Sequence, residues 1–360
     1  THIPRIVLTG GPCAGKSTIL SFIAQKVADK GYKSFIVPEV ATEFIQRGII
    51  PGETVSQAEF QKMVLPKIIR EENVVKEIAE KDPHEKKLVI CDRGRMDGQA
   101  YVSIAEYQKI HMSFGHNLVG LRDEPYDAVL HLRSTACGAE EFYTCDNNTA
   151  RRETIEEASR LDARTLTAWL GHPHLRVIEN RGDFDRKKRD TLNEVYSVLG
   201  IPQPVEIERK FLVRSYDFTA LPEHVEVEIL QYYLRTPFEE RIRKRSQFGH
   251  SVYFHTEKRE LSRGVRIERE KRISQEKYRE LLYRIDHDFD PIQKSRICFV
   301  WEHQYFELDL FVSERDHALC LLEIELLRMG QEVRLPSFID VDREVTDDPS
   351  YSNRELARKK

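Results

Sequence analysis

A glycine-rich segment near the start of the chain has the residue types and spacing needed to hold phosphate groups. An apolar run, residues 6–8, leads into Gly10-x-x-x-x-Gly15-Lys16-Ser17, which satisfies the Walker A pattern. Its glycines let successive backbone N–H groups wrap phosphates. The Lys16 ammonium can reach the β and γ oxygens, and the Ser17 hydroxyl can ligate Mg²⁺. The residues predicted to bind a nucleotide here are Gly10, Gly11, Pro12, Cys13, Ala14, Gly15, Lys16, Ser17 and Thr18.

Two acidic residues follow further apolar runs and would complete a magnesium and catalytic site. Asp92 ends the run 87–91, which is the Walker B arrangement, so it would hold Mg²⁺ directly or through water. A simple cap at the end of a strand is the alternative. Glu39 follows the run 34–37 and is interpreted as a general base or an acid beside the magnesium, against an ordinary acid at a helix start.

Three later residues are candidates for contacts to the nucleotide. Arg151 and Arg152 begin a predicted helix, where two positive charges are unfavourable unless an anion lies nearby. One of them would lie over the γ-phosphate as a lid arginine, and surface salt bridges are the alternative. Asn180 follows the fifth predicted strand and is expected to contact the base. The Asn-Lys-x-Asp guanine signature is absent, so the motifs leave guanine and adenine open.

The elements that must position these residues alternate between strand and helix up to about residue 200. The predicted strands are residues 6–9, 34–37, 88–91, 128–132 and 175–178, and the predicted helices follow Lys16 and cover 56–80, 152–170 and 187–199. This order is typical of a parallel sheet covered by helices, so we expect an α/β domain over 1–200. A Gly-Ile-Pro-Gln-Pro segment predicts a linker at 201–204 and a second domain over 205–360.

The second half places charged residues at alternate positions of predicted strands. Glu206, Glu208 and Lys210 share one face of the first run, because strand side chains alternate. Later runs repeat the pattern with Arg241, Arg243, Lys258, Glu268, Glu270, Arg296, Asp309, Glu323 and Glu325. Mixed charges are tolerable in a water-filled tunnel, where basic groups suit a polyphosphate or phosphorylated head group and acidic groups suit Mg²⁺ or Mn²⁺. A sheet with a salt-bridged solvent face is the alternative.

About eight strands, mostly antiparallel, are expected in this half. They cover 205–213, 225–234, 240–245, 251–258, 265–271, 296–301, 305–310 and 320–327, with one helix at 274–285 and a closing helix within 347–360. Short strands with turns between them favour a barrel or a curved sheet.

Composition limits the classes of function. The 360 residues carry 56 basic and 60 acidic side chains and a formal net charge of −4, so any anion site must come from local clustering. No apolar run approaches the roughly 18 residues that cross a bilayer. The six cysteines are scattered without C-x-x-C pairs, which favours reduced thiols and a cytoplasmic location.

Residues 205–357 resemble the CYTH superfamily of triphosphate tunnel proteins, whose sequences start with the pattern seen at Glu206, Glu208 and Lys210. The resemblance implies an eight-stranded antiparallel tunnel. It assigns anion binding to Lys210, Arg241, Arg243, Lys258 and Arg296, and metal binding to Glu206, Glu208, Asp309, Glu323 and Glu325. Members include inorganic triphosphatases, thiamine triphosphatases and class IV adenylyl cyclases.

Residues 5–199 resemble P-loop ATPases close to the NadR-type nucleotide kinases. The order of the two domains resembles that of a group of animal proteins described as GTP-binding, which also bind phosphoinositide and act in membrane-protein trafficking. The resemblance implies GTP or ATP with Mg²⁺ in the first domain. It also implies a phosphoinositide or similar polyphosphate-like anion in the second, and peripheral association with endomembranes.

Three functions follow from these observations. The first is a nucleotide-dependent regulator with slow hydrolysis, because no residue can be named as the base that activates water. The second is a two-site enzyme, a small-molecule kinase joined to a tunnel triphosphatase or cyclase, which the Asp92-Arg93 pair and the tunnel acids favour. The third, a nucleic-acid enzyme, is disfavoured by the net charge of −4 and the lack of a basic stripe, so no nucleic-acid partner is expected.

Overall fold

The computed structural model contains two compact units, Thr1–Pro202 and Gln203–Lys360. The structure describes residues 2–138, 154–201, 207–237, 239–262, 265–312, 319–328 and 330–359, apart from the side chains of 259–269. Arg151, Arg152 and Glu206 lie outside the described residues, as does the side chain of Glu268. The predictions for these four residues therefore stay predictions.

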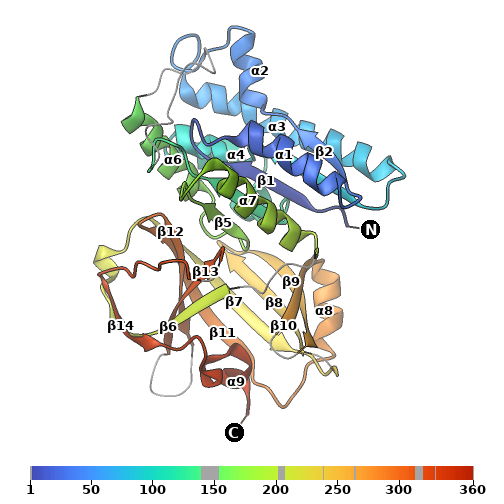
Figure 1. The fold of residues 1–360 in the computed structure, drawn as a ribbon, viewed down its shortest axis with the longest axis vertical. Coiled ribbons are helices and arrows are strands. Elements are labelled where there is room, and N and C mark those ends of the chain that lie inside the picture. The colour runs from blue at the N-terminus through green and yellow to red at the C-terminus, as the bar shows by residue number, and fades with distance from the viewer. Residues whose placement is uncertain are drawn as a thin grey trace. The chain divides into compact units, whose positions relative to one another are not determined.

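The first unit is built on a parallel sheet with the strand order β2-β3-β1-β4-β5 among its described residues (Figure 1). The strands are β1 (Arg5–Thr9), β2 (Lys33–Val37), β3 (Lys87–Asp92), β4 (Ala128–Leu132) and β5 (Leu175–Ile178). All of β1 is buried, between β3 and β4. A parallel strand covered on both faces needs a continuous apolar run, which is why the predicted runs lack alternation. The five strands and the α/β class predicted from the sequence are confirmed.

Helices cover both faces of this sheet. They are α1 (Lys16–Ala28), α2 (Val40–Gln46), α3 (Gln57–Lys81), α4 (Ile104–Ser113), α5 (Leu118–Arg122), α6 (Ile155–Ala168) and α7 (Phe184–Val198), with a 3₁₀ turn η1 (Asp97–Tyr101). Helices α1 and α7 lie side by side, whereas α3 packs against β2 and β3 (Figure 1).

Local capping chemistry sets where two of these helices begin. At the start of α3, Ser56 accepts from the Glu59 N–H and the Glu59 carboxylate accepts from the Ser56 N–H, a capping box. Helix α7 begins at Phe184, three residues before the predicted start. The reason is that Asp183 accepts from the Arg186 N–H at 2.7 Å and so caps an additional turn.

The second unit is an antiparallel sheet whose described strands run in the order β10-β9-β8-β7-β11-β12-β13-β6-β14. They are β6 (Ile207–Tyr216), β7 (His224–Tyr233), β8 (Glu239–Gln247), β9 (His250–Ser262), β10 (Val265–Ile273), β11 (Ile292–Trp301), β12 (Gln304–Phe311), β13 (Cys320–Leu326) and β14 (Ile339–Glu344). The eight predicted runs each correspond to one strand. Strand β14 is additional. Its alternation covers only Ile339 to Asp342, and its pairing with β6 contains two register shifts.

Short helical elements complete the second unit. They are α8 (Gln275–Leu282), the 3₁₀ turns η3 (Phe218–Ala220) and η4 (Pro349–Tyr351), and α9 (Asn353–Ala357). The predicted closing helix is therefore only a turn followed by a five-residue helix, because the chain passes through Ser352 in an extended conformation. In the parts of the chain that the structure describes, no helix combines the length and apolarity that crossing a membrane requires.

Strand register separates charged from apolar side chains in this sheet. Glu208 lies opposite Glu325, and Lys210 lies opposite Glu323. Arg296 lies opposite Asp309 on the next pair of strands. The intervening positions form an apolar core that includes Phe211, Phe299, Phe306, Leu308 and Leu322. We call the side that carries Glu208, Lys210, Arg241, Arg243, Lys258, Arg296, Asp309, Glu323 and Glu325 the charged face.

Candidate functional site

The glycine loop (residues 10–17) adopts a conformation that its glycines make possible. Gly10 and Gly15 have φ of 140° and 81°, and Cys13 between them has φ of 56°. A Cβ at Gly10 would collide with the carbonyl oxygen of Leu132. Helix α1 begins within the last two residues of the loop, at Lys16. The loop therefore lies at the positive end of a helix, where anions are stabilised.

Side chains from outside the loop orient its peptide groups. Ser134 Oγ donates to the carbonyl oxygen of Pro12, and Lys187 Nζ donates to that of Ala14 at 2.9 Å. In a trans peptide the carbonyl and the following N–H point in opposite directions. The two following N–H groups, those of Cys13 and Gly15, therefore point away from these donors and do not compete with an anion for them. Neither Ser134 nor Lys187 was predicted, because each is distant from the loop in sequence.

The charged residues predicted at the ends of separate strands lie together beside the loop. Lys16 Nζ donates to the carbonyl of Gly10 at 3.4 Å, and Arg93 Nη1 donates to the same oxygen at 3.3 Å. Arg93 Nε donates to Glu39 Oε1 at 2.6 Å. Arg93 has φ of 72°, a strained conformation for a residue with a side chain. This strained residue is the one whose guanidinium group contacts both Glu39 and the carbonyl oxygen of Gly10.

Burial and neighbouring charges shift the pKa values of Lys16 and Glu39 in this cluster. Burial and the Arg93 charge lower the pKa of Lys16 to about 8, although Glu39 and Asp92 oppose this. Burial would raise the pKa of Glu39, but Arg93 and Lys16 lower it to about 2. Glu39 is therefore ionised and held in an ion pair, and its role as a base stays a prediction.

Asp92 has the features of a metal ligand. Its Oδ1 atom is buried and makes no hydrogen bond to any described residue, and burial raises the pKa of its carboxyl. Ser17 lies exposed in the first turn of α1. An unsatisfied carboxylate oxygen and a hydroxyl suit Mg²⁺, which prefers oxygen ligands, so the residues present fit this ion. When bound, Mg²⁺ would neutralise charge on the phosphates.

Asp162 in α6 is a further loop contact that sequence reasoning missed. Its Oδ1 accepts from the Gly11 N–H at 2.8 Å and from the Ser134 N–H at 3.1 Å. A Cβ at Gly11 would lie 2.7 Å from the Asp162 Cβ, so this position requires glycine. Burial opposes ionisation of Asp162, but His131 and Arg133 hold its pKa below the usual range. No local signal marks an aspartate in the middle of a helix as a partner of the loop.

The side-chain amide of Asn180 makes hydrogen bonds near the glycine loop through both its nitrogen and its oxygen. Its Nδ2 donates to the carbonyls of Ser134 at 2.5 Å and of Cys137 at 3.2 Å. Its Oδ1 accepts from Lys187 Nζ at 2.8 Å. The predicted contact of Asn180 with a base stays a prediction, and it would compete with these bonds.

In the second unit, a buried ion-pair network occupies the charged face where β11, β12 and β13 adjoin. Arg296 donates to Asp309 Oδ1 through Nε and to Oδ2 through Nη2, both at 2.6 Å, and Lys294 also donates to Asp309. Arg296 further contacts Glu307, and its Nη2 lies 2.9 Å from Glu323 Oε2. Asp309 is fully buried. The network holds cationic groups at defined positions.

Carboxylates flank this network on β6 and β13. Lys210 Nζ lies 2.9 Å from Glu323 Oε1 and 3.6 Å from Glu208 Oε1. Burial and the neighbouring Glu323 charge raise the pKa of Glu208. Glu325 lies opposite Glu208 and is exposed. Across the described ranges, no group of three or more His, Cys, Asp or Glu side chains is arranged to hold a metal ion, and metal binding here stays a prediction.

Arginines on β8 extend the charged face. Arg243 Nη2 donates to both carboxylate oxygens of Glu270, at 2.7 and 2.6 Å, and Thr256 donates to the same carboxylate at 2.9 Å. Burial lowers the pKa of Arg243. In the register, Arg241 lies opposite Thr256, and Lys258 follows two residues later on the same face.

Two cationic residues of the charged face were not predicted from the sequence. Arg245 and Lys294 are 2% and 4% exposed. Arg245 lies two residues from Arg243 on one strand, and Lys294 lies two residues from Arg296 on another. Because strand side chains alternate, this spacing could have predicted both residues on the charged face.

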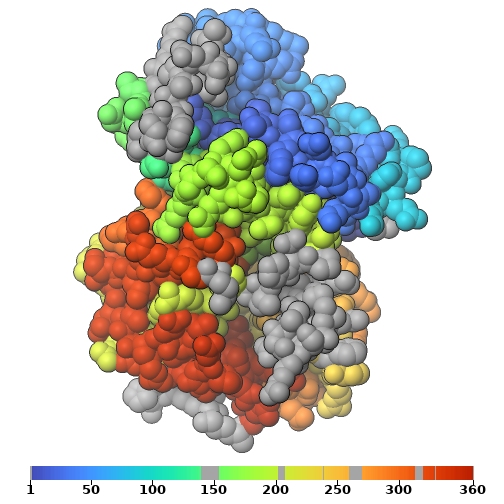
Figure 2. Space-filling model, in the orientation of Figure 1, coloured from blue at the N-terminus to red at the C-terminus, as the bar shows by residue number. Residues whose placement is uncertain are grey.

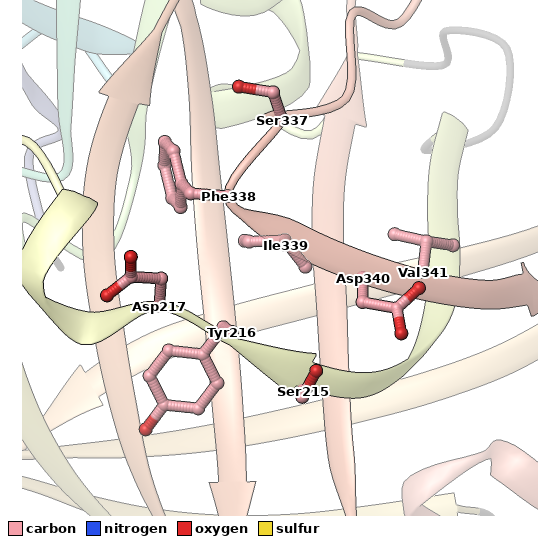
Figure 3. Close-up of a pocket in the computed structure, with 8 residues that line it drawn as sticks. All are labelled: Ser215, Tyr216, Asp217, Ser337, Phe338, Ile339, Asp340 and Val341. Atoms are coloured by element: carbon pink, nitrogen blue, oxygen red, sulfur yellow. The ribbon is translucent and has the colours of Figure 1, made fainter.

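A separate pocket of about 570 Å³ lies between the end of β6 and the start of β14 (Figure 3). The carboxylates of Asp217 and Asp340 are part of its lining, together with Tyr216 and Phe338. Its described lining includes none of the predicted site residues. Two carboxylates make this pocket a poor site for an anion.

Comparison with known families identifies the first unit. The family described as AAA domain matches residues 5–187, more than half of the chain. The chain belongs to this AAA-domain family. The match runs from β1 into α7, so the AAA domain contains the glycine loop, Asp92 and Asp162. Nucleotide binding is a property of this P-loop domain. Among curated proteins, none matches the chain.

Several solved structures are similar to part of the chain. The inorganic triphosphatase NE1496 is 30% identical over 44% of this chain and 97% of its own, with a TM-score of 0.33. A second structure, titled hypothetical protein NE1496, is 33% identical over 42% of this chain and 97% of its own, with a TM-score of 0.32. NadR in complex with NAD and AMP-PNP is 12% identical over 56% of this chain and 51% of its own, with a TM-score of 0.38.

Proposed function

We propose that the first unit binds a nucleoside triphosphate with Mg²⁺ and hydrolyses it slowly, so that the protein acts as a nucleotide-dependent regulator. The observation that carries this proposal is the meeting of Lys16 with Asp92 at a glycine loop that leads into the N-terminus of α1. The ammonium and the N–H groups would stabilise charge on the phosphates. Among the described residues we assign no base that activates water, and slow turnover follows.

The second unit is proposed to bind a phosphorylated anion on its charged face. Arg241 and Arg243 carry guanidinium groups that can donate paired hydrogen bonds to phosphate oxygens, and Arg296, Lys210 and Lys258 add charge. We further propose that the nucleotide is GTP, that the anion is a phosphoinositide, and that the protein acts in membrane-protein trafficking. Its support is the order of the two domains, which resembles that of the insect protein called TRPL translocation defect protein 14.

A head-group test uses vesicles with and without phosphoinositide. The Arg241→Gln, Arg243→Gln double variant should lose at least about ten-fold in binding to phosphoinositide vesicles, because two charged hydrogen bonds are removed. Arg214→Gln serves as the control, because Arg214 is 62% exposed and pairs with Asp342. Undiminished vesicle binding by the double variant would exclude this face as the lipid site.

A two-site enzyme is the second candidate. The relationship to an inorganic triphosphatase favours it, as do the carboxylates of Glu208, Glu323 and Glu325 beside the cationic residues. In this function the charged face would hydrolyse a triphosphate with Mg²⁺ or Mn²⁺, and the first unit would be a small-molecule kinase.

Time courses with GTP, ATP and tripolyphosphate separate the two candidates. In the regulator, Glu208→Gln leaves slow nucleotide turnover unchanged, because Glu208 is not part of the glycine-loop site. The matched control is Glu226→Gln, since Glu226 is exposed on the opposite face of the sheet. Fast tripolyphosphate hydrolysis that falls by about 100-fold or more in Glu208→Gln alone would favour the enzyme.

A further inference from the structure

Helix α7 begins directly against the glycine loop. The ring of Phe184, the first residue of α7, packs on Gly15: a Cβ built there would lie 2.6 Å from Cε2 and 2.9 Å from Cζ of the ring. Three residues later, Lys187 is 3% exposed and donates to the Ala14 carbonyl at 2.9 Å. These two contacts fix the first turn of α7 on the segment that would hold the phosphates.

The Phe184 ring is exposed despite these contacts. Phe184 is 42% exposed, although it is a large apolar residue in a rigid helix. The Lys188 ammonium lies 5.7 Å from its ring centroid and 5.2 Å from that of Phe22 in α1. Figure 2 shows that the side chains of α7 (yellow-green) and α1 (blue) adjoin on the surface of this unit. An aromatic surface therefore remains open beside the glycine loop.

The residue expected to hold the base is already engaged elsewhere. Both ends of the Asn180 amide are bonded within the protein, to Ser134, Cys137 and Lys187. A base held by this loop would need another partner. Every nucleobase has a π-face that stacks on an aromatic ring, whatever its hydrogen-bonding edge.

We propose that Phe184 is the stacking platform for the base of the nucleotide whose phosphates bind on the glycine loop. This inference rests on the proposed nucleotide binding and adds the site of the base. Because stacking does not read the edge of a base, this contact supports GTP and ATP alike. Selection between guanine and adenine then comes from other residues.

Binding of GTP, ATP and tripolyphosphate tests the proposal. Phe184→Ala should weaken GTP and ATP by about 5- to 100-fold, because one stacked base is lost. Tripolyphosphate has no base, so its own dissociation constant, obtained by displacement of a labelled nucleotide and corrected for the affinity of that label, should change by less than about two-fold. Phe184→Trp should keep nucleotide affinity, and its added fluorescence should be quenched by nucleotide but not by tripolyphosphate.

Controls distinguish this proposal from the one on which it rests. Phe114→Ala removes another aromatic residue of the same unit, 38% exposed and at the end of α4, and should bind like the wild type. Nucleotide binding within two-fold of wild type in Phe184→Ala overturns the stacking proposal, as does an equal loss for tripolyphosphate. If wild type and Lys16→Ala bind nucleotide equally poorly, the proposed nucleotide site itself fails.

Discussion

Lys16→Ala is expected to reduce nucleotide affinity by about 100-fold or more, because charge-assisted hydrogen bonds to phosphate are lost. Turnover should fall by about 10²- to 10³-fold. The reason lies in the position of Lys16, where a partly buried ammonium contacts the loop carbonyls and is surrounded by Glu39, Asp92 and Arg93. Titration calorimetry and product chromatography measure the two effects. Lys26→Ala is the control, because Lys26 lies on the same helix with 42% of its side chain exposed.

The pH dependence of binding checks whether the Lys16 charge is responsible. The pKa of Lys16 is lowered to about 8 in the free protein, so the contribution of Lys16 to affinity should be constant below that pH. Above it, binding must take up a proton, and affinity should fall by up to about ten-fold per pH unit. Lys16→Arg keeps its charge and should remove this step, whereas any contribution from Lys187 would remain. A profile that is unchanged in Lys16→Arg would contradict the assignment.

Asp309→Asn is expected to destabilise the second unit by about 3–5 kcal/mol, because it leaves buried cations without their counter-ion. Asp309 is fully buried and accepts from both Lys294 and Arg296, so the uncharged amide removes the centre of the network. Native-state hydrogen exchange of the amides in β11 and β12 measures the opening free energy of this sheet without involving the first unit.

The same variant also probes anion binding on the charged face. Saturating tripolyphosphate should restore part of the lost stability, because a bound anion replaces the missing negative charge. Asp342→Asn is the matched control, since it removes a surface partner of Arg214 and should cost less than about 1 kcal/mol. A loss below 1 kcal/mol in Asp309→Asn would mean that the network contributes little to stability.

Elements with a strong local pattern could be predicted from the sequence. Strand β1 was recognisable because a strand buried on both faces needs an unbroken apolar run, and the glycine loop because its residues are contiguous. Alternation likewise placed Glu208 and Lys210 on one face of β6 before any partner was known. Strand β14 escaped prediction because its alternation covers only Ile339 to Asp342 and its pairing with β6 is irregular.

The sequence by itself determined which groups could hold phosphate, and the tertiary structure decided how they are held. Lys16, Ser17 and Asp92 are marked by neighbours in the chain. The residues that orient the backbone of the glycine loop lie far away in the sequence. Asp162 is 151 positions from Gly11, and Lys187 is 173 positions from Ala14. Such contacts leave no local pattern, because hydrogen bonds and ion pairs depend on spatial proximity that only the packing of α6 and α7 creates.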